Sequence, residues 1–520
     1  MNTMKHYIIL AVALLSGSAL RAQETMLNNY ISNTSDLFGT ARYVGMGGAM
    51  GALGADVSAI TSNPAALGLF RRSTISLTFG GIRQSDTNAE DKSAVNASFD
   101  QGGFVLSFPS GDRGLKYINF GFNYQKRNSL TQTFIADDTN ASLFDYLDPV
   151  RTYFGKNFSN PIVKNAEAAG LFGKFEDGVD PYLTKKYSGN RFMRTISGHV
   201  RGFDFNLSGN VDDRYFFGLT LGLNDLRYAS NAYYDEYRGA AADKYDFSYN
   251  NYQEIRGTGF TMKLGFIARP FVESPFRVGI AIETPTWYKL SYRGESEFVT
   301  HFDQGTDTKG PFKHVDRAVT YRMDPSTLQY TLYTPWRFRV SAGHTFGTQL
   351  AVGVEYEYCD YGATKMGYPK SSSYYDGYRY ITNSGSEEDR AMTKQTKASL
   401  QGVHSFKCGL EFKPVPEFAI RAGYNYFGAS SKKGVHTDHT IDSYATEFVT
   451  GTDFMLLGSV NLITCGLGYA GKHFYADLAY KFRMQKAEFF PFHDYNATVQ
   501  TSRQLNLDRH QLLLSLGYKF

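Results

Sequence analysis

Four basic residues of this sequence have the type and position needed to bind an acidic group. Lys263, Arg337, Arg339 and Arg421 lie in segments where apolar and polar residues alternate, and each is on the polar side of its alternation. Lysine and arginine form charge-assisted hydrogen bonds with carboxylates. Two interpretations stay open: one or two of these cations bind a ligand carboxylate, or all of them form ion pairs within the fold.

These four residues belong to a larger set of charged side chains that share one parity. The other members are Arg277, Glu283, Glu355, Glu357, Lys407, Glu411 and Lys481. Successive side chains of a strand point to opposite faces, so the whole set is expected on one face. A polar inner face of this kind is typical of a membrane barrel.

Other patterns that could support chemistry are incomplete. His436 and His439 are three residues apart in a polar stretch and could recruit a metal or haem, but no strand or helix is expected to hold them. The N-terminal stretch GMGGAMGALG lacks the Lys-Ser or Lys-Thr pair of a phosphate-binding loop. Cys359, Cys408 and Cys465 are interpreted as small apolar residues of the outer face. No motif marks a nucleophile with its base, so we expect no enzyme, no metal and no cofactor.

The elements that would position these residues are strands. Two-residue alternation recurs from Ser73 onward in about fourteen segments, an even number that is typical of single-chain bacterial barrels. The 41 Phe and 38 Tyr residues suit the outer face and the interfacial girdles of such a barrel. Beyond the N-terminal stretch there is no apolar run of the roughly 18 residues that a membrane helix needs. The net charge of +4 indicates no nucleic-acid partner.

The connections between these segments alternate in length. Short ones are expected at residues 109–114, 209–214, 270–275, 347–349, 413–417 and 470–473, and long polar ones near 82–96, 126–195, 229–251, 294–328, 362–400, 429–457 and 484–505. Outer-membrane barrels have short periplasmic turns and long outer loops. The sequence therefore predicts an all-β protein, a transmembrane antiparallel β-barrel of about 14 strands in the outer membrane of a Gram-negative cell.

The two ends of the chain carry targeting features. Residues 1–22 have a basic start, a short apolar core and then small residues, which predicts a secretory signal peptide cleaved after Ala22, with cleavage after Ala19 as the alternative. The last stretch, LLLSLGYKF, alternates and ends on an aromatic residue. Tyr518 and Phe520 are the predicted signal for the barrel-assembly machinery.

Residues 23–72 differ from everything that follows them. They are rich in Gly and Ala and show no strand alternation, which predicts a plug or hatch packed inside the lumen. Residues 73–520 would then form the barrel with its long extracellular loops.

The plug text GMGGAMGALGADVSAITSNPAALG, with Asn63, Pro64 and Ala65 at its core, resembles the hatch of the FadL/TodX family of outer-membrane transporters of hydrophobic compounds. Later pieces, among them TPWRFRVSAG, FKCGLEFKPVPEFAIRAGYNYF and the final LGYKF, resemble strands and turns of the Bacteroidetes branch of that family. The resemblance covers most of the chain, and the plug motif is its specific part.

The resemblance implies a monomeric fourteen-stranded barrel and uptake, without energy input, of long-chain fatty acids or other hydrophobic small molecules. It implies lateral exit through a wall gap at a kinked third strand, although Phe120 to Asn128 alternates cleanly through Tyr124. It also implies that Asn63 to Ala65 brace the hatch, and that the 126–195 connection, with a helical piece at Asn165 to Phe175, is a lid. The expected surroundings are outer-membrane lipid and lipopolysaccharide.

Two alternatives to transport stay open. Some FadL-like barrels are non-transporting accessory or platform proteins, for example in type IX secretion. Relatives are also sometimes called hemin receptors, which would give His436 and His439 a role. An importer should have an apolar pocket above the hatch and a gap in the wall, whereas a platform needs only a packed plug.

Overall fold

The computed structural model describes most of the chain that follows the predicted signal peptide. The described residues are 23–32, 36–85, 95–111, 114–137, 142–144, 146–147, 161–172, 187–238, 247–302, 317–322, 324–375, 380–435, 443–492 and 502–520. The predicted signal peptide, residues 1–22, and the pair His436 and His439 lie outside these residues.

The described part of the chain contains 21 strands in one sheet. They are β1 (Thr74–Gln84), β2 (Asn96–Pro109), β3 (Leu115–Ser129), β4 (Gln132–Ile135), β5 (Tyr187–Val211), β6 (Tyr215–Arg238), β7 (Phe247–Ala268), β8 (Arg277–Glu283), β9 (Trp287–Phe302), β10 (Arg317–Arg322), β11 (Ser326–Tyr333), β12 (Arg337–Phe346), β13 (Leu350–Asp360), β14 (Lys365–Tyr375), β15 (Tyr380–Glu388), β16 (Gly402–Val415), β17 (Phe418–Phe427), β18 (Phe454–Ala470), β19 (Phe474–Phe490), β20 (Arg503–Asn506) and β21 (Arg509–Lys519). The helices are α2 (Gln23–Ser32), α3 (Ala41–Gly45), α5 (Pro161–Ala168) and α6 (Arg390–Ser399), with short 3-10 helices η1 (Val57–Thr61), η2 (Pro64–Leu69), η4 (Tyr361–Ala363) and η5 (Tyr444–Glu447).

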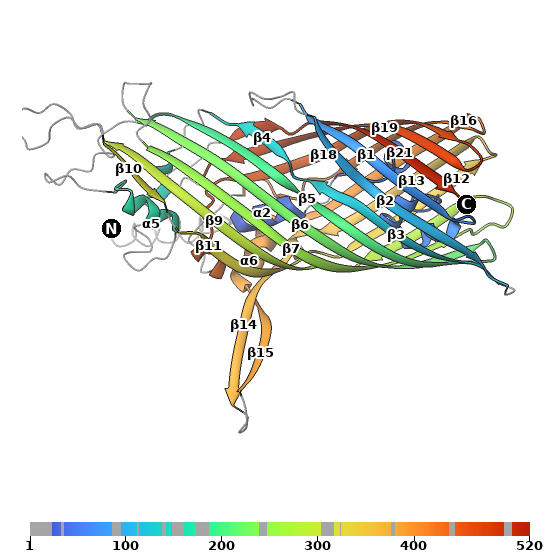
Figure 1. The fold of residues 1–520 in the computed structure, drawn as a ribbon, viewed down its shortest axis with the longest axis horizontal. Coiled ribbons are helices and arrows are strands. Elements are labelled where there is room, and N and C mark those ends of the chain that lie inside the picture. Colours follow the sequence, from blue (N-terminus) through green and yellow to red (C-terminus); the bar gives the residue numbers. More distant parts are fainter. Residues whose placement is uncertain are drawn as a thin grey trace, which may run out of the picture.

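These strands build a closed antiparallel barrel (Figure 1). Its wall has 14 strand positions, which we call staves. Four staves consist of two successive strands: β3 with β4, β8 with β9, β11 with β12, and β20 with β21. The strand β10 extends the sheet beside β9, and β14 with β15 forms a hairpin that leaves the wall. The wall closes where β1 pairs with β21, from Thr74 opposite Lys519 to Gln84 opposite Arg509. The predicted barrel class and strand number are confirmed.

The two ends of the barrel differ in their connections (Figure 1). The end near the C-terminus has short turns, such as Val211 to Arg214, where the N–H of Arg214 donates to the carbonyl of Val211 at 3.0 Å. Asp212 and Asp213 have φ of 53° and 54°, which is the type I′ geometry that matches the twist of a hairpin. Helix α5 and strand β10 lie at the opposite end.

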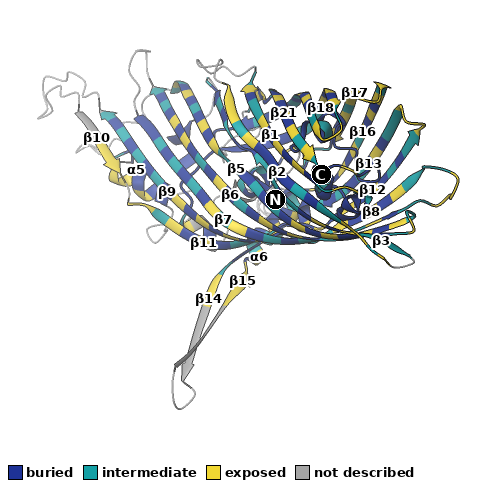
Figure 2. Cartoon of the chain, turned by 45° about the vertical axis from the view of Figure 1, so that its right-hand side comes forward, coloured by how far each residue is buried: buried dark blue, intermediate teal, exposed yellow. Residues whose placement is uncertain are grey.

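Apolar side chains cover the outside of the barrel toward the short-turn end. Ile75 and Leu77 of β1 and Leu514 and Leu516 of β21 are exposed, and exposed and buried residues alternate along the strands (Figure 2). A soluble protein rarely exposes so continuous an apolar surface, whereas a bilayer would cover it. The apolar faces point outward and are not stacked on each other, as they would be in a β-sandwich.

The polarity of the two faces inverts part-way along β5, β6, β7 and β9. A row of outward side chains in direct register marks this border, and we call it the border row: Tyr124, Phe203, Leu223, Phe260, Trp287 and Tyr333. On the short-turn side of the row the outward residues are apolar, as at Leu221, and the inward ones polar, as at Thr220. Beyond the row the inward residues are apolar, as at Leu226 and Tyr228. The outer half of the barrel therefore has an apolar interior and a polar exterior.

This inversion makes some of the sequence-based boundaries wrong. The sequence predicts long loops near 229–251 and 294–328. In the structure, β6 continues to Arg238, β7 already begins at Phe247, and β9 continues to Phe302. The apolar residues of these extensions lie on the opposite parity from those of the membrane part, so the alternation is hard to follow across the border. The described helix α5 starts at Pro161, before the predicted start at Asn165.

The cysteines divide between the two faces. Cys408 and Cys465 are exposed on the outside, as predicted, but Cys359 is buried. The prediction was wrong for Cys359 because its parity in β13 is that of Glu355 and Glu357, which point inward.

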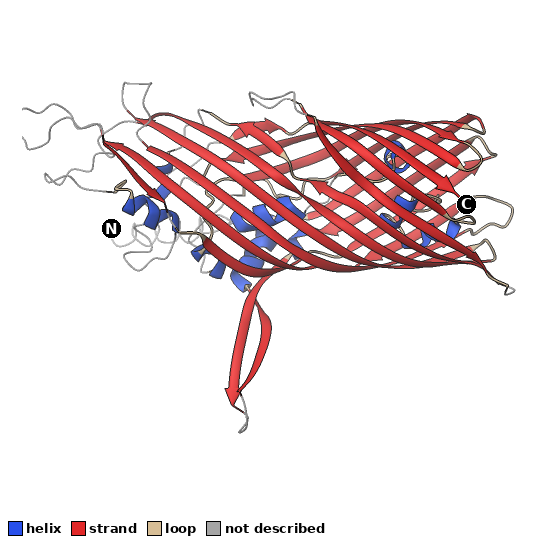
Figure 3. Cartoon of the chain, in the orientation of Figure 1, coloured by secondary structure: helices blue, strands red, loops and turns tan. Residues whose placement is uncertain are grey.

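Residues 36–70, with α3, η1 and η2, lie inside the barrel against the inner face of the wall (Figure 3). Among the described residues, no helix is both long and apolar enough to cross a membrane. Inward glycines let this N-terminal segment approach the strands: a Cβ atom added at Gly218, Gly353 or Gly409 would lie under 3.0 Å from its backbone. Glycine in a strand interior is typical of such a close backbone approach.

We expect Gly409→Ala to displace the segment at Met46, whose carbonyl oxygen is the atom that the new methyl group would meet. Overpacking of this kind costs about 1–3 kcal/mol. The thermal unfolding temperature of the purified full-length barrel should fall, and trypsin should cleave faster after Arg42. Gly385→Ala in β15, where nothing lies within 4 Å, is the matched control. Equal behaviour of the two variants would contradict close seating of the segment.

Candidate functional site

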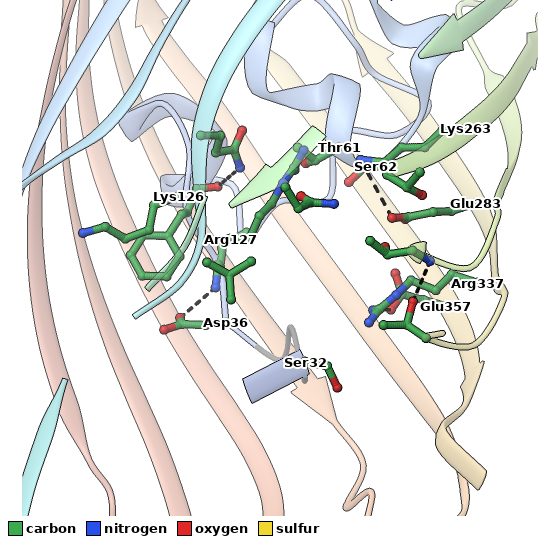
Figure 4. A pocket seen from close by; sticks show the side chains of 18 of the residues that line it. Ser32, Asp36, Thr61, Ser62, Lys126, Arg127, Lys263, Glu283, Arg337 and Glu357 are labelled. Carbon is green, nitrogen blue, oxygen red and sulfur yellow. Dashed lines mark hydrogen bonds and ion pairs between the residues drawn. The ribbon is translucent and has the colours of Figure 1, made fainter. Parts of the chain in front are cut away.

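A cavity of about 100 Å³ lies in the lumen beside the N-terminal segment (Figure 4). More cations than carboxylates line it: Lys126, Arg127, Lys263, Arg337, Arg339 and Lys407 against Asp36, Glu283 and Glu357. The volume has room for several waters or a small polar group. Pockets that take a whole drug-sized ligand measure roughly 300–1,000 Å³, so this cavity could hold only the head of such a molecule.

Arg337 and Arg339 of β12 form the most tightly paired side of the cavity. The parity of β12 turns both side chains inward, and the register places Arg339 opposite Glu357 of β13. Arg337 Nη1 lies 3.1 Å from Glu357 Oε1, and Arg339 Nε donates to the other oxygen of the same carboxylate. Arg339 Nη2 also lies 2.8 Å from Glu283 Oε2. These two predicted cations are therefore held by acids of the wall.

Lys263 of β7 is paired more loosely. Its Nζ atom lies 3.7 Å from Asp204 and 4.0 Å from Glu283, which is beyond hydrogen-bond distance for both. Asp204 instead accepts a hydrogen bond from Arg127. Lys263 is buried, and its ammonium has three donors, so it keeps hydrogen-bonding capacity for another acceptor in the cavity.

Arg421 of β17 lies apart from the other three predicted cations and does not line the cavity. Its guanidinium donates to Glu411 of β16 and to Asp477 of β19, each at 2.6 Å. Arg42 of the N-terminal segment binds the same Glu411, with Nε 3.0 Å from Oε2. This buried network ties the segment to three strands of the wall.

Asn63 connects η2 to the wall on the other side of the segment. Its Oδ1 accepts the N–H of Ala65 at 3.0 Å and so caps η2, whose first residue is Pro64. Its Nδ2 lies 3.3 Å from the carbonyl oxygens of both Phe266 and Ile280, in β7 and β8.

Asp36 ties the start of the segment to β19. The Nζ atom of Lys481 lies 2.6 Å from Asp36 Oδ1 and 4.3 Å from the centre of the Phe38 ring. Burial alone would raise the pKa of the Asp36 carboxyl, but the nearby cations Lys481, Arg483 and Arg509 together hold that pKa below its ordinary value. Asp36 is therefore a carboxylate at neutral pH, and it compensates the buried lysine.

Several solved structures are similar to this barrel. A FadL homologue of Pseudomonas aeruginosa matches with a TM-score of 0.51 and 13% identity, over 94% of this chain and 99% of the other. The chain has the FadL fold. The toluene transporters TodX of P. putida and TbuX of Ralstonia pickettii each match with a TM-score of 0.47, at 13% and 14% identity, over 93% and 94% of this chain and 99% of theirs.

The fold assignment rests on the first of these structures, because the other two scores are lower. No protein-family profile and no curated protein sequence matches this chain. This likeness shows the fold, and the expectations that the protein is not an enzyme and lies in the outer membrane stay predictions. No group of three or more His, Cys, Asp or Glu side chains in the described ranges is placed to hold a metal ion.

In this FadL fold the third stave is distorted above the membrane part. The ladder between β2 and β3 ends at Gln101 opposite Gln125, although both strands continue. The register between β3 and β5 then shifts between Lys126 and Asn128, and the stave is interrupted before β4 begins at Gln132. The clean alternation through Tyr124 is confirmed, and the break follows it.

The diverging strands are held by polar and aromatic contacts. Lys126 Nζ lies 3.0 Å from Asp100 Oδ1 on the inner side. On the outer side the rings of Phe99 and Tyr124 stack, with centroids 5.3 Å apart. The wall between β2 and β3 is thus closed by side chains instead of backbone hydrogen bonds.

Tyr518 and Phe520, the predicted assembly signal, lie on the outer face of the seam. Both are exposed, their ring centroids are 6.3 Å apart, and Tyr518 also packs edge-on against Phe474. The N–H of Phe520 donates to the carbonyl of Ser73. Their role in assembly stays a prediction.

Three charged residues of the cavity were not predicted to point into the lumen: Lys126, Arg127 and Asp36. The bulge in β3 turns both Lys126 and Arg127 inward, as their bonds to Asp100 and Asp204 show, and a strict alternation would separate them. The only sign in the sequence is that the alternation of β3 stops after Gln125. Asp36 lies in a segment that has no periodicity to assign its direction.

We expect Arg421→Met to destabilise the barrel strongly, because it leaves the buried Glu411 and Asp477 short of a cation. Breaking a buried ion pair in this way costs about 3–5 kcal/mol. Urea unfolding of the full-length protein in micelles measures the loss. Lys370→Met, which removes the exposed pair with Glu387, should leave the stability nearly unchanged, because water screens an exposed pair. Two equal, small losses would show that the network does not support the fold.

Proposed function

We propose that this protein carries hydrophobic molecules with an acidic head, such as long-chain fatty acids, passively across the outer membrane. The observation that supports this proposal is the change of polarity along the lumen. A large apolar cluster fills the outer half, and the cation-rich cavity lies directly beside it. Val200 and Tyr288 belong to both, so one molecule could place its apolar part in the cluster and its head in the cavity.

The outer cluster offers an apolar environment for a hydrocarbon chain. It draws on the inward residues of the wall and on helices α2, α5 and α6, and aromatic rings pack within it. The ring centroids of Tyr249 and Phe298 are 4.5 Å apart, and those of Phe192 and Phe489 are 4.8 Å apart. This cluster is packed, so entry of a chain requires that its side chains rearrange.

The cavity suits an anionic head. Its lining has six cations and three carboxylates. Three of the cations also pair with acids that do not line the cavity, namely Asp100, Asp204 and Glu355. Among Lys263, Arg337 and Arg339, Lys263 has the longest ion-pair distances. We propose Lys263 as the group that binds the carboxylate and the arginines as supports of the acids around it.

The proposed exit is sideways, between β2 and β3. Their backbone ladder stops at Gln101 and Gln125, and beyond that point the pair of Asp100 with Lys126 and the stack of Phe99 on Tyr124 bridge them. Side-chain contacts are easier to open than a continuous ladder. A molecule that leaves here would reach the level of the lipid head groups without passing the N-terminal segment, which we propose acts as the hatch.

A second candidate function is a platform for other proteins, with no transport. The hairpin of β14 and β15 favours it, because this hairpin pairs with β11 only at Lys365 to Gly367 and then projects away from the wall (Figures 1 and 2). The small volume of the cavity also fits a lumen that stays closed.

We expect Lys263→Met to weaken oleate binding by about tenfold or more, because a charge-assisted hydrogen bond contributes about 1.5–3 kcal/mol. Binding is measured by displacement of a fluorescent fatty acid from the purified full-length protein. Methyl oleate has no carboxylate, so its binding should be the same in the variant and the parent protein.

Lys370→Met, at an exposed position of the hairpin, is the matched control for charge. Liposomes that contain the parent protein should take up oleate faster than empty liposomes. No difference in uptake would contradict transport and favour the platform. Equal oleate binding by Lys263→Met and the parent would contradict only the role of Lys263.

A further inference from the structure

The outward face of β5, β6, β7 and β9 changes character immediately beyond the border row. The row itself is largely aromatic: the rings of Tyr124 and Phe203 are 5.3 Å apart and those of Phe260 and Trp287 are 6.0 Å apart. Aromatic girdles of membrane barrels lie at the level of the lipid head groups. Outward side chains one to three outward positions beyond the row are therefore placed where lipid head groups begin.

Basic residues gather at these positions, and we call them the basic patch: Arg201, Arg227, Arg256, Lys289 and Arg293. The strand register makes them neighbours, with Arg201 opposite Asp225, Arg227 opposite Arg256, and Lys289 opposite Thr258. The patch extends over four adjacent strands on one side of the barrel.

The acids among the basic patch are too few to neutralise it. Three carboxylates share the surface, and each pairs with an arginine two residues away on its own strand: Asp225 with Arg227, Glu254 with Arg256, and Glu295 with Arg293. Arg201 and Lys289 form no ion pair with any described residue, and the Nε atom of Arg201 is buried without a hydrogen-bond acceptor. Two positive charges therefore remain uncompensated.

The central pair of the patch brings two like charges together, although each arginine has one carboxylate neighbour on its own strand. Arg227 and Arg256 lie directly opposite each other on β6 and β7, and their side chains are 60% and 64% exposed. Like charges in directly opposite positions destabilise a sheet. A phosphate between them would accept hydrogen bonds from both guanidinium groups, which suit phosphate geometry.

We propose that the basic patch binds the phosphate groups of a membrane lipid head group. The neighbouring border row and apolar wall would contact the acyl chains of the same molecule, while the arginines hold its phosphates. A soluble anion would gain nothing from the aromatic row, so the combination selects a phosphorylated lipid. This site is on the outside of the wall and is independent of the lumen.

The test uses the full-length protein in detergent and a diphosphorylated lipid A as the probe. We expect R227Q/R256Q to retain this lipid about tenfold less tightly through size-exclusion chromatography than the parent protein does. The double variant K365Q/K370Q removes the same charge from the exposed hairpin and should retain the lipid fully. Unchanged heat-resistant gel mobility confirms that both variants are folded.

Two further arms identify the source of the phosphate. Lipid A from which both phosphates have been removed should bind the parent protein as weakly as the intact lipid binds R227Q/R256Q. Inorganic phosphate at the lipid's concentration should not displace the lipid. Equal retention by R227Q/R256Q and the parent overturns the proposal, as does an equal loss in K365Q/K370Q, tight binding of the dephosphorylated lipid, or displacement by inorganic phosphate.

Discussion

The structure depends on one constraint: a charge that points into the closed barrel must find its partner inside it. Removing a charge from water is costly, and only opposite charges with good geometry offset that cost. Arg339 therefore lies between Glu283 and Glu357, and Arg421 between Glu411 and Asp477. Arg42 of the N-terminal segment shares Glu411 with Arg421. The need to pair buried charges therefore fixes the N-terminal segment as well as the strands of the wall.

The lumen is built from two zones that meet this constraint differently. The zone beside the N-terminal segment is polar and satisfied by ion pairs, while the outer zone avoids charge and is packed with apolar rings. Lys263 stands at the junction, with acids nearby but none within hydrogen-bond distance. A barrel that only held its plug would not need a lysine with free hydrogen-bonding capacity beside an apolar zone. For this reason transport is the first proposal and the platform is the second.

The barrel, its strand number and the inward direction of Lys263, Arg337, Arg339 and Arg421 could be predicted, because two-residue alternation fixes the face of every residue in a regular strand. The prediction failed where that rule has an exception. The bulge after Lys126 turns two consecutive side chains the same way, and at the border row the apolar face exchanges parity without a break in the strand. Neither event has a residue type that marks it. The pairing that separates Arg421 from the cavity depends on register, which alternation alone does not give.

The seam between β1 and β21 has a consequence for biogenesis. Ser515 of the last strand bonds both Thr78 of the first strand and the backbone N–H of Ala41 in the interior, each at 2.6 Å. Ser515 therefore contacts both the first strand, at the closure of the barrel, and the N-terminal segment inside the barrel. A nascent chain that closes without the N-terminal segment would keep the bond from Ser515 to Thr78 and lose the bond to Ala41, so the segment adds a contact to the strand that closes the wall.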